Sequence, residues 1–301
     1  MTATATTSSA SRLLFDQLRV SRTGPAAFLR ALFRHRQAQL GGFIIAILIL
    51  SAIFAPIVAP YDPYEIRVGK PLSGPSRQHW LGVDDLGRDL LSRIIFGARI
   101  TLRIGIIIVA IEALIGITVG LIAGYYGGWI DSLLMRLTDI ALAFPGFILA
   151  LAIVAVLGPG LTNAMIAVGI SAWPYLARVV RGSVLSVRET EYVTAARVIG
   201  ATNARIMWRA ILPNVLAPII VLASLEFPAA VLYASGLSFL GLGAQPPSPE
   251  WGALLTDARN FIRTAPHLIN APGAAIFFVV LAFNLLGNTL RDVLDPRLRQ
   301  Q

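Results

Sequence analysis

Cysteine is absent from the chain, and charged residues are scarce. With no cysteine among 301 residues, disulfide bonds and thiolate-bound metal sites are excluded. Charged residues make up 14% of the chain, whereas an ordinary soluble domain has roughly 25%. Hydrophobic residues make up 56%, and the mean hydropathy is +0.72. A soluble fold of this size would lack polar side chains for its surface, so the composition predicts an integral membrane protein.

Several sequence motifs for nucleotide binding, metal binding and catalysis are also missing. The only lysine, Lys70, is followed by Pro71, so the chain has no phosphate-binding loop of the Gly-x-x-x-x-Gly-Lys-[Ser/Thr] type. His35, His79 and His267 are scattered, and no His and Glu pair has the spacing of a metal site. Neither a Gly-x-Ser-x-Gly motif nor paired aspartates at bilayer depth occur. We therefore expect no catalytic residue, no metal site and no ATP bound through that loop.

Long uncharged runs alternate with charged segments along most of the chain. A membrane-spanning helix takes roughly 20 apolar residues. The uncharged run 140–177 is long enough for two spans, with Gly158-Pro159-Gly160 as the turn between them. Residues 126–139, with Asp131 and Asp139, are expected to be a short, solvated connection at the membrane edge. The pattern predicts six spans: Leu40–Pro60, Thr101–Tyr125, two between Ile140 and Ala177, Asn214–Leu237 and Ala271–Leu290.

The distribution of basic residues predicts the orientation. The net charge is +9, but the arginines lie between apolar runs and form no continuous basic face, which argues against nucleic-acid binding. They are concentrated in segments that six spans would place on one side, and the positive-inside bias makes that side cytoplasmic. We expect a multi-pass protein of the plasma or inner membrane with both termini in the cytoplasm. The expected parts are a partly disordered tail 1–36, a first helix and extracytoplasmic loop 37–98, a five-helix core 99–290 and a second tail 291–301.

Residues 191–213 form the longest water-facing helical stretch between two apolar ones. The consecutive small residues Ala195-Ala196 would let a helix approach another surface closely. Gly200 permits the left-handed backbone that ends such a helix, and Thr202 or Asn203 can cap the next one. Taken alone, this pattern is equally compatible with an ordinary amphipathic helix–turn–helix.

The same stretch resembles the cytoplasmic coupling loop of importer-type ABC-transporter permeases. That loop reads Glu-Ala-Ala, three residues, Gly, nine residues, Ile, one residue, Leu-Pro. Here it reads Thr194-Ala195-Ala196, Gly200 and Leu212-Pro213 at the same spacing, with Thr194 for the glutamate and Ala210 for the isoleucine. The shape is therefore expected to be kept, but not the contact of the missing glutamate. The resemblance implies coupling to an ATPase through loop 188–213, by Glu191, Thr194, Ala195, Ala196, Gly200, Ala201, Arg205, Leu212 and Pro213.

Further stretches resemble the "C"-type permeases of dipeptide/oligopeptide importers. Residues 79–99 are similar to that family's loop before the second span, and residues 237–243 and 246–251 to its loop after the fifth. Residues 282–297 are similar to its C-terminal signature. The family often has an acid where this chain has Ala234, so no role for that acid is carried over.

This resemblance implies an all-α integral membrane protein. It would have six transmembrane helices of the type I ABC importer (MetI-like) kind and a cytoplasmic coupling helix. The chain would be no enzyme but a permease subunit, paired with a homologous second permease. Two ABC ATPase subunits would bind ATP and Mg²⁺, and an extracytoplasmic solute-binding protein would deliver a di- or oligopeptide; this chain itself would bind no cofactor. The loop residues expected to face the binding protein are Trp80, Asp84, Asp85, Arg88 and Trp251.

The sequence leaves the cargo and one rival class open. Nickel, glutathione or another small solute fits the same architecture as well as a peptide does. An ion-coupled secondary transporter is the alternative from another class; it would need no ATPase and often has internal repeats, of which we see no convincing example.

Two carboxylates lie inside predicted spans. An ionised carboxylate at bilayer depth is costly unless it is paired or hydrated. Glu112 and Glu226 could line a water-filled translocation pathway and meet a substrate's amino group. Alternatively, each could pair with an arginine such as Arg103 or be a protonated, packed carboxyl. Asn284 in the sixth span is a further pathway candidate, although a hydrogen bond between helices is the commoner role for such a residue.

Overall fold

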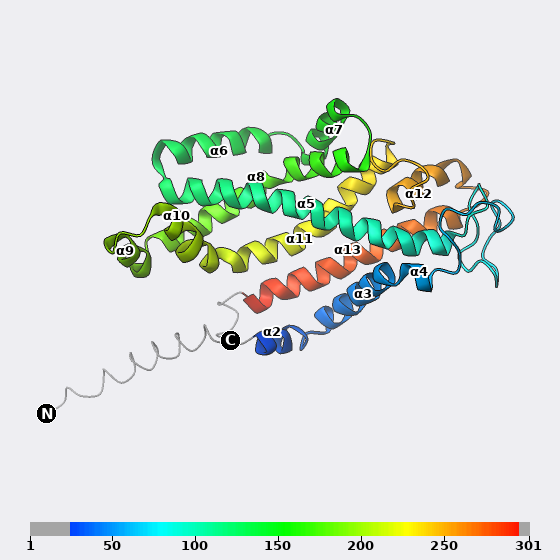
Figure 1. Cartoon of the computed structure of the whole chain (residues 1–301), viewed down its shortest axis with the longest axis horizontal. Coiled ribbons are helices and arrows are strands. Elements are labelled where there is room, and N and C mark those ends of the chain that lie inside the picture. Colours follow the sequence, from blue (N-terminus) through cyan, green and yellow to red (C-terminus); the bar gives the residue numbers. More distant parts are fainter. Residues whose placement is uncertain (1–24, 295–301) are drawn as a thin grey trace.

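The computed structural model describes residues 25–294, and helices account for all the regular structure in that range. Figure 1 shows an elongated bundle whose long helices run lengthwise. At one end lie the short helices α9 (Glu191–Val198) and α10 (Asn203–Arg205), and we call it the foot end. At the other end lie the segment 59–89 and α12 (Trp251–Ala258), and we call it the loop end.

Four helical stretches are long and apolar enough to cross a membrane. Their apolar side chains cover most of the circumference, so burial inside the bundle accounts for only part of their hydropathy and lipid for the rest. They are Arg36–Ile53 (α3), Leu90–Tyr126 (α5), Asn203–Phe239 (with α11, Leu212–Phe239) and His267–Leu294 (α13).

The predicted count of six spans is reached only when two further elements are included. α6 (Gly128–Leu142) and α7 (Gly146–Leu157) together are apolar enough for a span, but they are bent by 89° at the break between them. α8 (Leu161–Arg188) has 28 residues and is not among the helices that pass by length and hydropathy. α8 forms its most extensive contact with α5, so its place in the bundle depends on packing more than on its hydropathy.

The prediction for the third span was wrong in its boundaries. Residues 126–139 were expected to be a connection, but most of them belong to α6, and the chain turns before Pro145, which precedes α7. Proline has no N–H and disfavours a helical residue before it, which favours a break at this point. Proline alone does not force one, because α8 and α11 continue through Pro174 and Pro228. The expected turn at Gly158-Pro159-Gly160 is present between α7 and α8.

Asp131 and Asp139 were expected to be solvated. This was wrong for Asp131, whose side chain is 17% exposed, whereas the side chain of Asp139 is 58% exposed and pairs with an arginine at the surface. Asp131 accepts two hydrogen bonds from Arg181 of α8, at 2.5 and 2.6 Å, and Asp139 accepts one from Arg178 at 2.6 Å. Charge-assisted bonds of this kind are short and directional. They hold α6 against α8.

Glycines allow α5 and α8 to approach closely. A Cβ atom on Gly120 would lie 2.5 Å from the carbonyl oxygen of Ala177, and one on Gly124 would lie 2.8 Å from Val184. Side chains at these two positions would force the helices apart. The backbones of α5 and α8 are therefore in near contact along the half of the bundle that leads to the foot.

Two apolar clusters fill the bundle along its length. The first lies toward the loop end and includes Ile108 and Ala230. The second lies toward the foot end and includes Leu121, Val184 and Ile211. Both draw residues from α5, α8 and α11, so these three helices form the continuous core.

The first predicted span is shorter than expected. α3 ends at Ile53, and a separate turn of helix, α4 (Ala55–Val58), follows it. Before α3, α2 (Pro25–Leu32) is the described part of the predicted tail 1–36. The predictions for residues 1–24 and 295–301 lie outside the described residues.

Candidate functional site

We call residues 191–213 the foot. It begins with α9, and the end of this helix has the geometry that Gly200 predicted. The backbone of Gly200 has φ +77°, in the left-handed region. Its N–H donates to the carbonyl of Arg197, and the N–H of Ala201 donates to that of Ala196, each at 3.0 Å. This pair of bonds is a Schellman motif, which satisfies the last carbonyls of a helix and reverses the chain.

The second half of the foot leads into α11. Oγ1 of Thr202 accepts from the N–H of Arg205 at 3.3 Å, so Thr202, one of the two expected caps, begins α10. Residues Ile206–Ile211 then form a wide π-helical turn before α11. Pro213 offers no N–H to the carbonyl four residues earlier, which accounts for an altered hydrogen-bond pattern at this point.

The foot is attached to the ends of α5 and α8. Val193 is fully buried in the second apolar cluster. The hydroxyl of Tyr125, on α5, donates to Oδ1 of Asn203 in the foot at 2.8 Å. The guanidinium of Arg188, the last residue of α8, donates to the carbonyl of Gly124 on α5 at 2.9 Å and so ties the ends of the two long helices together. The guanidinium of Arg197 lies 5.6 Å from the centre of the Tyr125 ring. A force on the foot would therefore be transmitted to both long helices.

The tip of the foot exposes apolar side chains. Val198 and Ile199 are 82% and 83% exposed, and Trp208 is 52% exposed. Beside them is a hollow of about 270 Å³, lined by Ala196, Ile199, Gly200, Ala201, Arg205, Ile206, Arg209 and Ala210. Exposed apolar groups beside a hollow are typical of a surface that binds another protein. The sequence analysis did not include Val198 and Ile199, although two apolar residues directly before the helix-ending glycine were the available signal.

The nine residues predicted for coupling all lie on the foot or at its exit, and several are accessible. The hydroxyl of Thr194 makes only a long bond, 3.4 Å, to the carbonyl of Thr190 within its own helix. Glu191, Thr194, Ala195, Gly200, Arg205 and Pro213 are exposed, and Ala196, Ala201 and Leu212 are half-buried.

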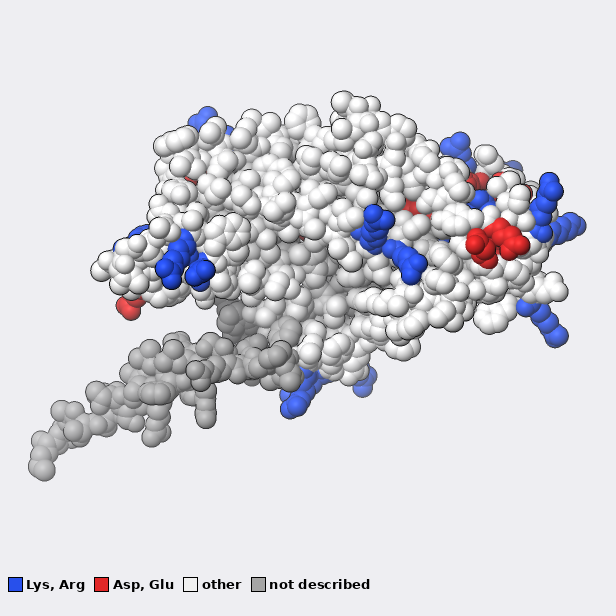
Figure 2. Space-filling model, in the orientation of Figure 1, with Lys and Arg blue, Asp and Glu red and all other residues white. Residues whose placement is uncertain are grey.

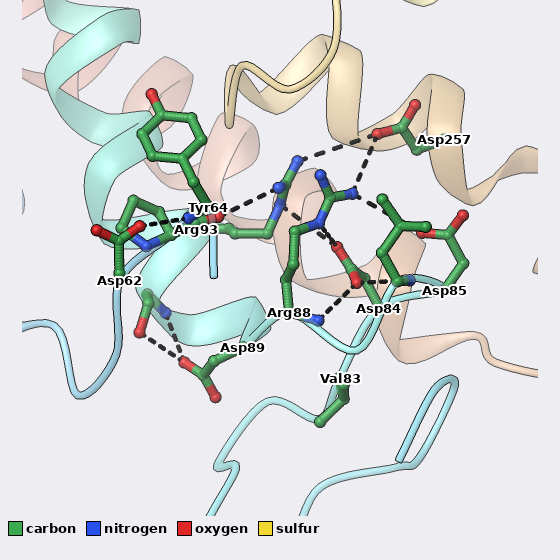
Figure 3. A network of polar contacts seen from close by, with 12 residues as sticks. Asp62, Tyr64, Val83, Asp84, Asp85, Arg88, Asp89, Arg93 and Asp257 are labelled. Atoms are coloured by element: carbon green, nitrogen blue, oxygen red, sulfur yellow. Dashed lines mark hydrogen bonds and ion pairs between the residues drawn. The ribbon is translucent and has the colours of Figure 1, made fainter. Parts of the chain in front are cut away.

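Ionic contacts hold the loop end together (Figure 3). Oδ1 of Asp84 accepts from two backbone N–H groups, those of Leu86 and Arg88, at 3.0 and 2.8 Å. Its Oδ2 atom accepts from Nε of Arg88 at 2.5 Å and lies 3.6 Å from Nε of Arg93. Both guanidinium groups also lie within 4.0 Å of Asp257 on α12. Residues far apart in sequence are thereby joined into one buried cluster.

Burial dominates the electrostatics of this cluster. Arg93 has no exposed surface. Burial raises the pKa of Asp257 above its ordinary value, although Arg93 and Arg88 act in the opposite direction. The two arginines therefore stabilise the Asp257 carboxylate by less than its burial destabilises it.

Trp251 is part of the same internal packing. Its side chain is 1% exposed, and its indole N–H donates to the carbonyl of Ile94 at 3.1 Å. A Cβ atom on Gly97 would lie 2.4 Å from that indole nitrogen, so only glycine leaves room for the ring. Glu250 caps α12 by accepting from the N–H groups of Gly252 and Ala253, each at 2.9 Å.

The five residues predicted to face a binding protein therefore differ in accessibility. Trp80 is 71% exposed, and the side chain of Asp85 is 35% exposed. Asp84, Arg88 and Trp251 are buried within this chain. Only Trp80 and Asp85 remain available to a partner through their side chains.

The pathway candidates lie on three different helices. Glu112 on α5 is 2% exposed, and Glu226 on α11 is half-buried. Arg103 forms no ion pair among residues 25–294, so the suggested pairing with a glutamate does not occur. Nδ2 of Asn284 donates to the carbonyl of Val280 at 2.8 Å, within its own helix and not between helices.

Comparison with known families gives this architecture its class. Residues 116–300 match the model for the binding-protein-dependent transport system inner membrane component, and residues 26–75 match the N-terminal TM domain of oligopeptide transport permease C. The chain is a membrane permease subunit of an ABC importer, not an enzyme. It belongs to the binding-protein-dependent transport system inner membrane component family. This membership overturns the alternative of an ion-coupled secondary transporter.

Relatives with assigned cargo cover nearly the whole chain. The dipeptide transport system permease protein of Alkalihalophilus pseudofirmus is 50% identical over 90% of this chain and 89% of its own length. The glutathione transport system permease protein of Pectobacterium atrosepticum is 47% identical over 92% and 93%. The di/tripeptide transport system permease protein of Pseudomonas aeruginosa is 47% identical over 89% and 90%.

A solved structure supports the fold. The methionine ABC transporter MetNI contains a chain that aligns with a TM-score of 0.54 at 22% identity, covering 68% of this chain and 96% of that one. The expected MetI-like, all-α fold is thereby confirmed, although the count of six spans is not reproduced by length and hydropathy alone.

Proposed function

We propose that this subunit forms half of the translocation pathway of an ATP-driven importer of di- or oligopeptides. A homologous second permease would supply the other half. Two ABC ATPase subunits would bind ATP and Mg²⁺, and an extracytoplasmic binding protein would deliver the solute. The foot supports this proposal most directly, because it combines an exposed apolar tip with attachment to α5 through Tyr125 and to the core through the buried Val193. The foot and both termini would then lie in the cytoplasm, in a multi-pass protein of the cell membrane.

The foot would act as a lever. When ATP brings the two ATPase subunits together, each ATPase subunit would move the permease foot that is bound to it. Because Val193 and Tyr125 join the foot to the core, and Arg188 ties the end of α8 to α5, the motion would reach both long helices. Coupling of this kind requires different contacts in the inward-open and outward-open states. The close approach of α5 and α8 favours their movement as one body.

The translocation pathway would run along α8, α11 and α13. A groove of about 610 Å³ lies between these helices. Glu226 and Asn284, both half-buried, lie on two of the helices that line this groove and would be the pathway candidates in reach of a solute. Glu112 is 2% exposed and would contribute only after a rearrangement. The groove is lined by Tyr175, Val179, Asn214, Ala217, Pro218, Val221, Leu222, Leu225, Arg291 and Leu294.

At the opposite end, Trp80 and Asp85 would contact the binding protein. Both are accessible beside the buried ionic cluster. Asp84, Arg88 and Trp251 would support this surface from within. The cluster would keep the docking surface in one shape.

The cargo has one specific alternative, glutathione. It is itself a small peptide, and permeases for glutathione and for dipeptides have nearly the same identity to this chain. Nickel or another small solute has no comparable support.

Transport in proteoliposomes separates these cargoes. The chain is reconstituted with its second permease, its ATPase subunits and the matching binding protein, and uptake of a labelled dipeptide is measured. We expect uptake that requires ATP and is suppressed by excess unlabelled dipeptide more strongly than by excess glutathione. The reverse order of competition would assign glutathione as the cargo. Uptake driven by an ion gradient without ATP would contradict the proposed function as a whole.

A further inference from the structure

An open hollow lies between α3 and α5, in the half of the bundle toward the loop end. It has a volume of about 420 Å³. Its walls combine apolar side chains with two guanidinium groups, and they are formed by Ile49, Ala52 and Ile53 of α3 and by Arg99, Leu102, Arg103, Ile106 and Ile107 of α5. Figure 2 shows blue side chains on the mostly white middle of the bundle, where α5 and α3 run side by side in Figure 1. We call this hollow the arginine groove.

Arg99 fixes the depth of the arginine groove in the membrane. Its Nε atom donates to the carbonyl of Ala52 at 3.0 Å, and its Nη2 atom donates to that of Ile53 at 3.4 Å. These carbonyls belong to the last turn of α3, where carbonyls lack a helical partner and favour a cation. Arg99 therefore lies at the level where the membrane-spanning helix α3 ends. Arg103 lies on the same face of α5, about 6 Å closer to the bilayer centre.

The positive charges of Arg99 and Arg103 are not compensated by this chain. Neither side chain forms an ion pair among residues 25–294. Both are exposed, and Arg103 makes no side-chain hydrogen bond in the described part of the chain. The neighbouring apolar side chains also face outward, since Ile53 and Ile106 are 57% and 61% exposed. An arginine on such an apolar surface at bilayer depth is costly unless an anion or water compensates its charge.

We propose that the arginine groove binds one anionic phospholipid, with the phosphate on Arg99 and Arg103 and part of an acyl chain in the hollow. Guanidinium groups suit this ligand, because they donate parallel hydrogen bonds to phosphate oxygens. The groove also has the polarity of a lipid. Its apolar walls continue toward the bilayer centre, through Ile106 on α5 and Ile49 on α3, whereas Arg99 lies nearer the membrane surface. Two uncompensated positive charges favour a headgroup with a net negative charge over a zwitterionic one.

A lipid fits this groove better than a neighbouring protein does. A protein would have to place an acidic side chain at this depth, and acidic residues are rare in membrane-spanning helices. Anionic headgroups, in contrast, are present along the membrane surface. The bound lipid would bridge α3 and α5 and hold α3 against the core. In the orientation proposed above it belongs to the outer leaflet, and only this leaflet assignment rests on the proposed function.

Photo-cross-linking of the assembled transporter tests the site. The complex is equilibrated with a sub-saturating amount of phosphatidylglycerol that carries a diazirine in its acyl chain. After illumination and digestion, mass spectrometry locates the adducts. We expect them on the segments of α3 and α5 around Ile49 and Ile106, and we expect much weaker labelling there by phosphatidylcholine with the same diazirine. Arg103→Gln should reduce labelling by phosphatidylglycerol about fivefold, since one arginine near an anionic lipid surface contributes about 1 kcal/mol.

Two controls accompany this variant. Arg103 makes no internal hydrogen bond or ion pair within residues 25–294, so its replacement should leave the fold intact, and an unchanged melting temperature of the purified complex checks this. Arg77→Gln removes another exposed arginine, in the loop-end segment, and should keep the labelling of the parent. Excess inorganic phosphate should not displace the lipid, because it has no acyl chain to occupy the hollow.

Three results would overturn the proposed lipid site. Equal labelling by both phospholipids, or labelling that Arg103→Gln leaves unchanged, would mean that lipids contact this surface without a specific site. Absence of labelling around Ile49 and Ile106 with either phospholipid would mean that something else, such as a neighbouring subunit, covers the groove. Displacement of the lipid by inorganic phosphate would assign the two arginines to a free anion.

Discussion

Gly200→Val is expected to reduce ATP-driven transport at least tenfold while the permease still inserts and pairs with its partner. The left-handed backbone at Gly200 costs an ordinary L-residue about 1–2 kcal/mol, and valine is among the residues least able to adopt it. No atom lies within 4 Å of an added Cβ, so the cost comes from the backbone and not from a clash. The Schellman bonds of α9 would open, and the apolar tip at Val198 and Ile199 would lose its position. Uptake in proteoliposomes and recovery of the complex on a size-exclusion column measure the two effects separately.

Two controls separate this effect from general damage. Gly200→Asn should retain most of the transport, because asparagine tolerates the left-handed conformation. Gly182→Ala on α8 also adds a Cβ into open space, but in an ordinary helical position, and should have little effect. If Gly200→Val transports as well as the parent, the shape of the foot is not needed for coupling.

Asp84→Ala is expected to have the largest effect on stability, of about 3–5 kcal/mol, because it leaves buried arginines without their closest carboxylate. Asp84 is 7% exposed and is the closest acidic partner of both Arg88 and Arg93. The substitution also removes the acceptor of two backbone N–H groups that shape the turn. The expected result is a marked loss of thermal stability of the detergent-purified permease.

The neighbouring residue is the matched control. Asp85 carries the same charge but is more exposed and has only a long contact, 3.8 Å, with Arg88. Asp85→Ala should leave stability nearly unchanged and, if this surface meets the binding protein, should weaken that interaction. Equal and small losses of stability for both variants would show that Asp84 is a surface residue, as the sequence had suggested, and not a structural one.

The local shape of the foot could be predicted from sequence because it depends on near neighbours. A glycine alone would not be informative. What matters is that Gly200 follows a short helix and that Thr202, two residues later, can cap the next one. Both interactions involve residues within five positions of each other. The expected helix end and helix start are therefore present.

The bent third span could not be predicted in the same way. The run 140–177 has no charge, and hydropathy cannot distinguish a straight helix from two helices joined at an angle. Pro145, at which the chain actually turns, lies within this run. The direction of α6 is also fixed by Asp131 and Asp139, whose partners lie 50 and 39 residues away on α8. Pairs so distant in sequence leave no local pattern.

The burial of Trp251 at the loop end also could not be predicted from local sequence. A tryptophan in a polar loop is usually interfacial, and Trp251 was expected at the surface. Its actual environment comes from Gly97 and Ile94 on α5, about 150 residues earlier in the chain. The fold brings the two segments together, and no spacing within either loop indicates it.

Site-specific cross-linking tests most directly whether the foot binds the ATPase subunits. The chain has no cysteine, so Ile199→Cys introduces a unique attachment point at an 83% exposed position on the foot. Trp80→Cys, at a 71% exposed position of the loop end, is the control. A maleimide carrying a photoreactive group is attached to each variant, and the illuminated transporter is analysed for covalent partners. We predict an ATPase adduct from Ile199→Cys and none from Trp80→Cys. An ATPase adduct from Trp80→Cys alone would contradict the proposed docking of the foot.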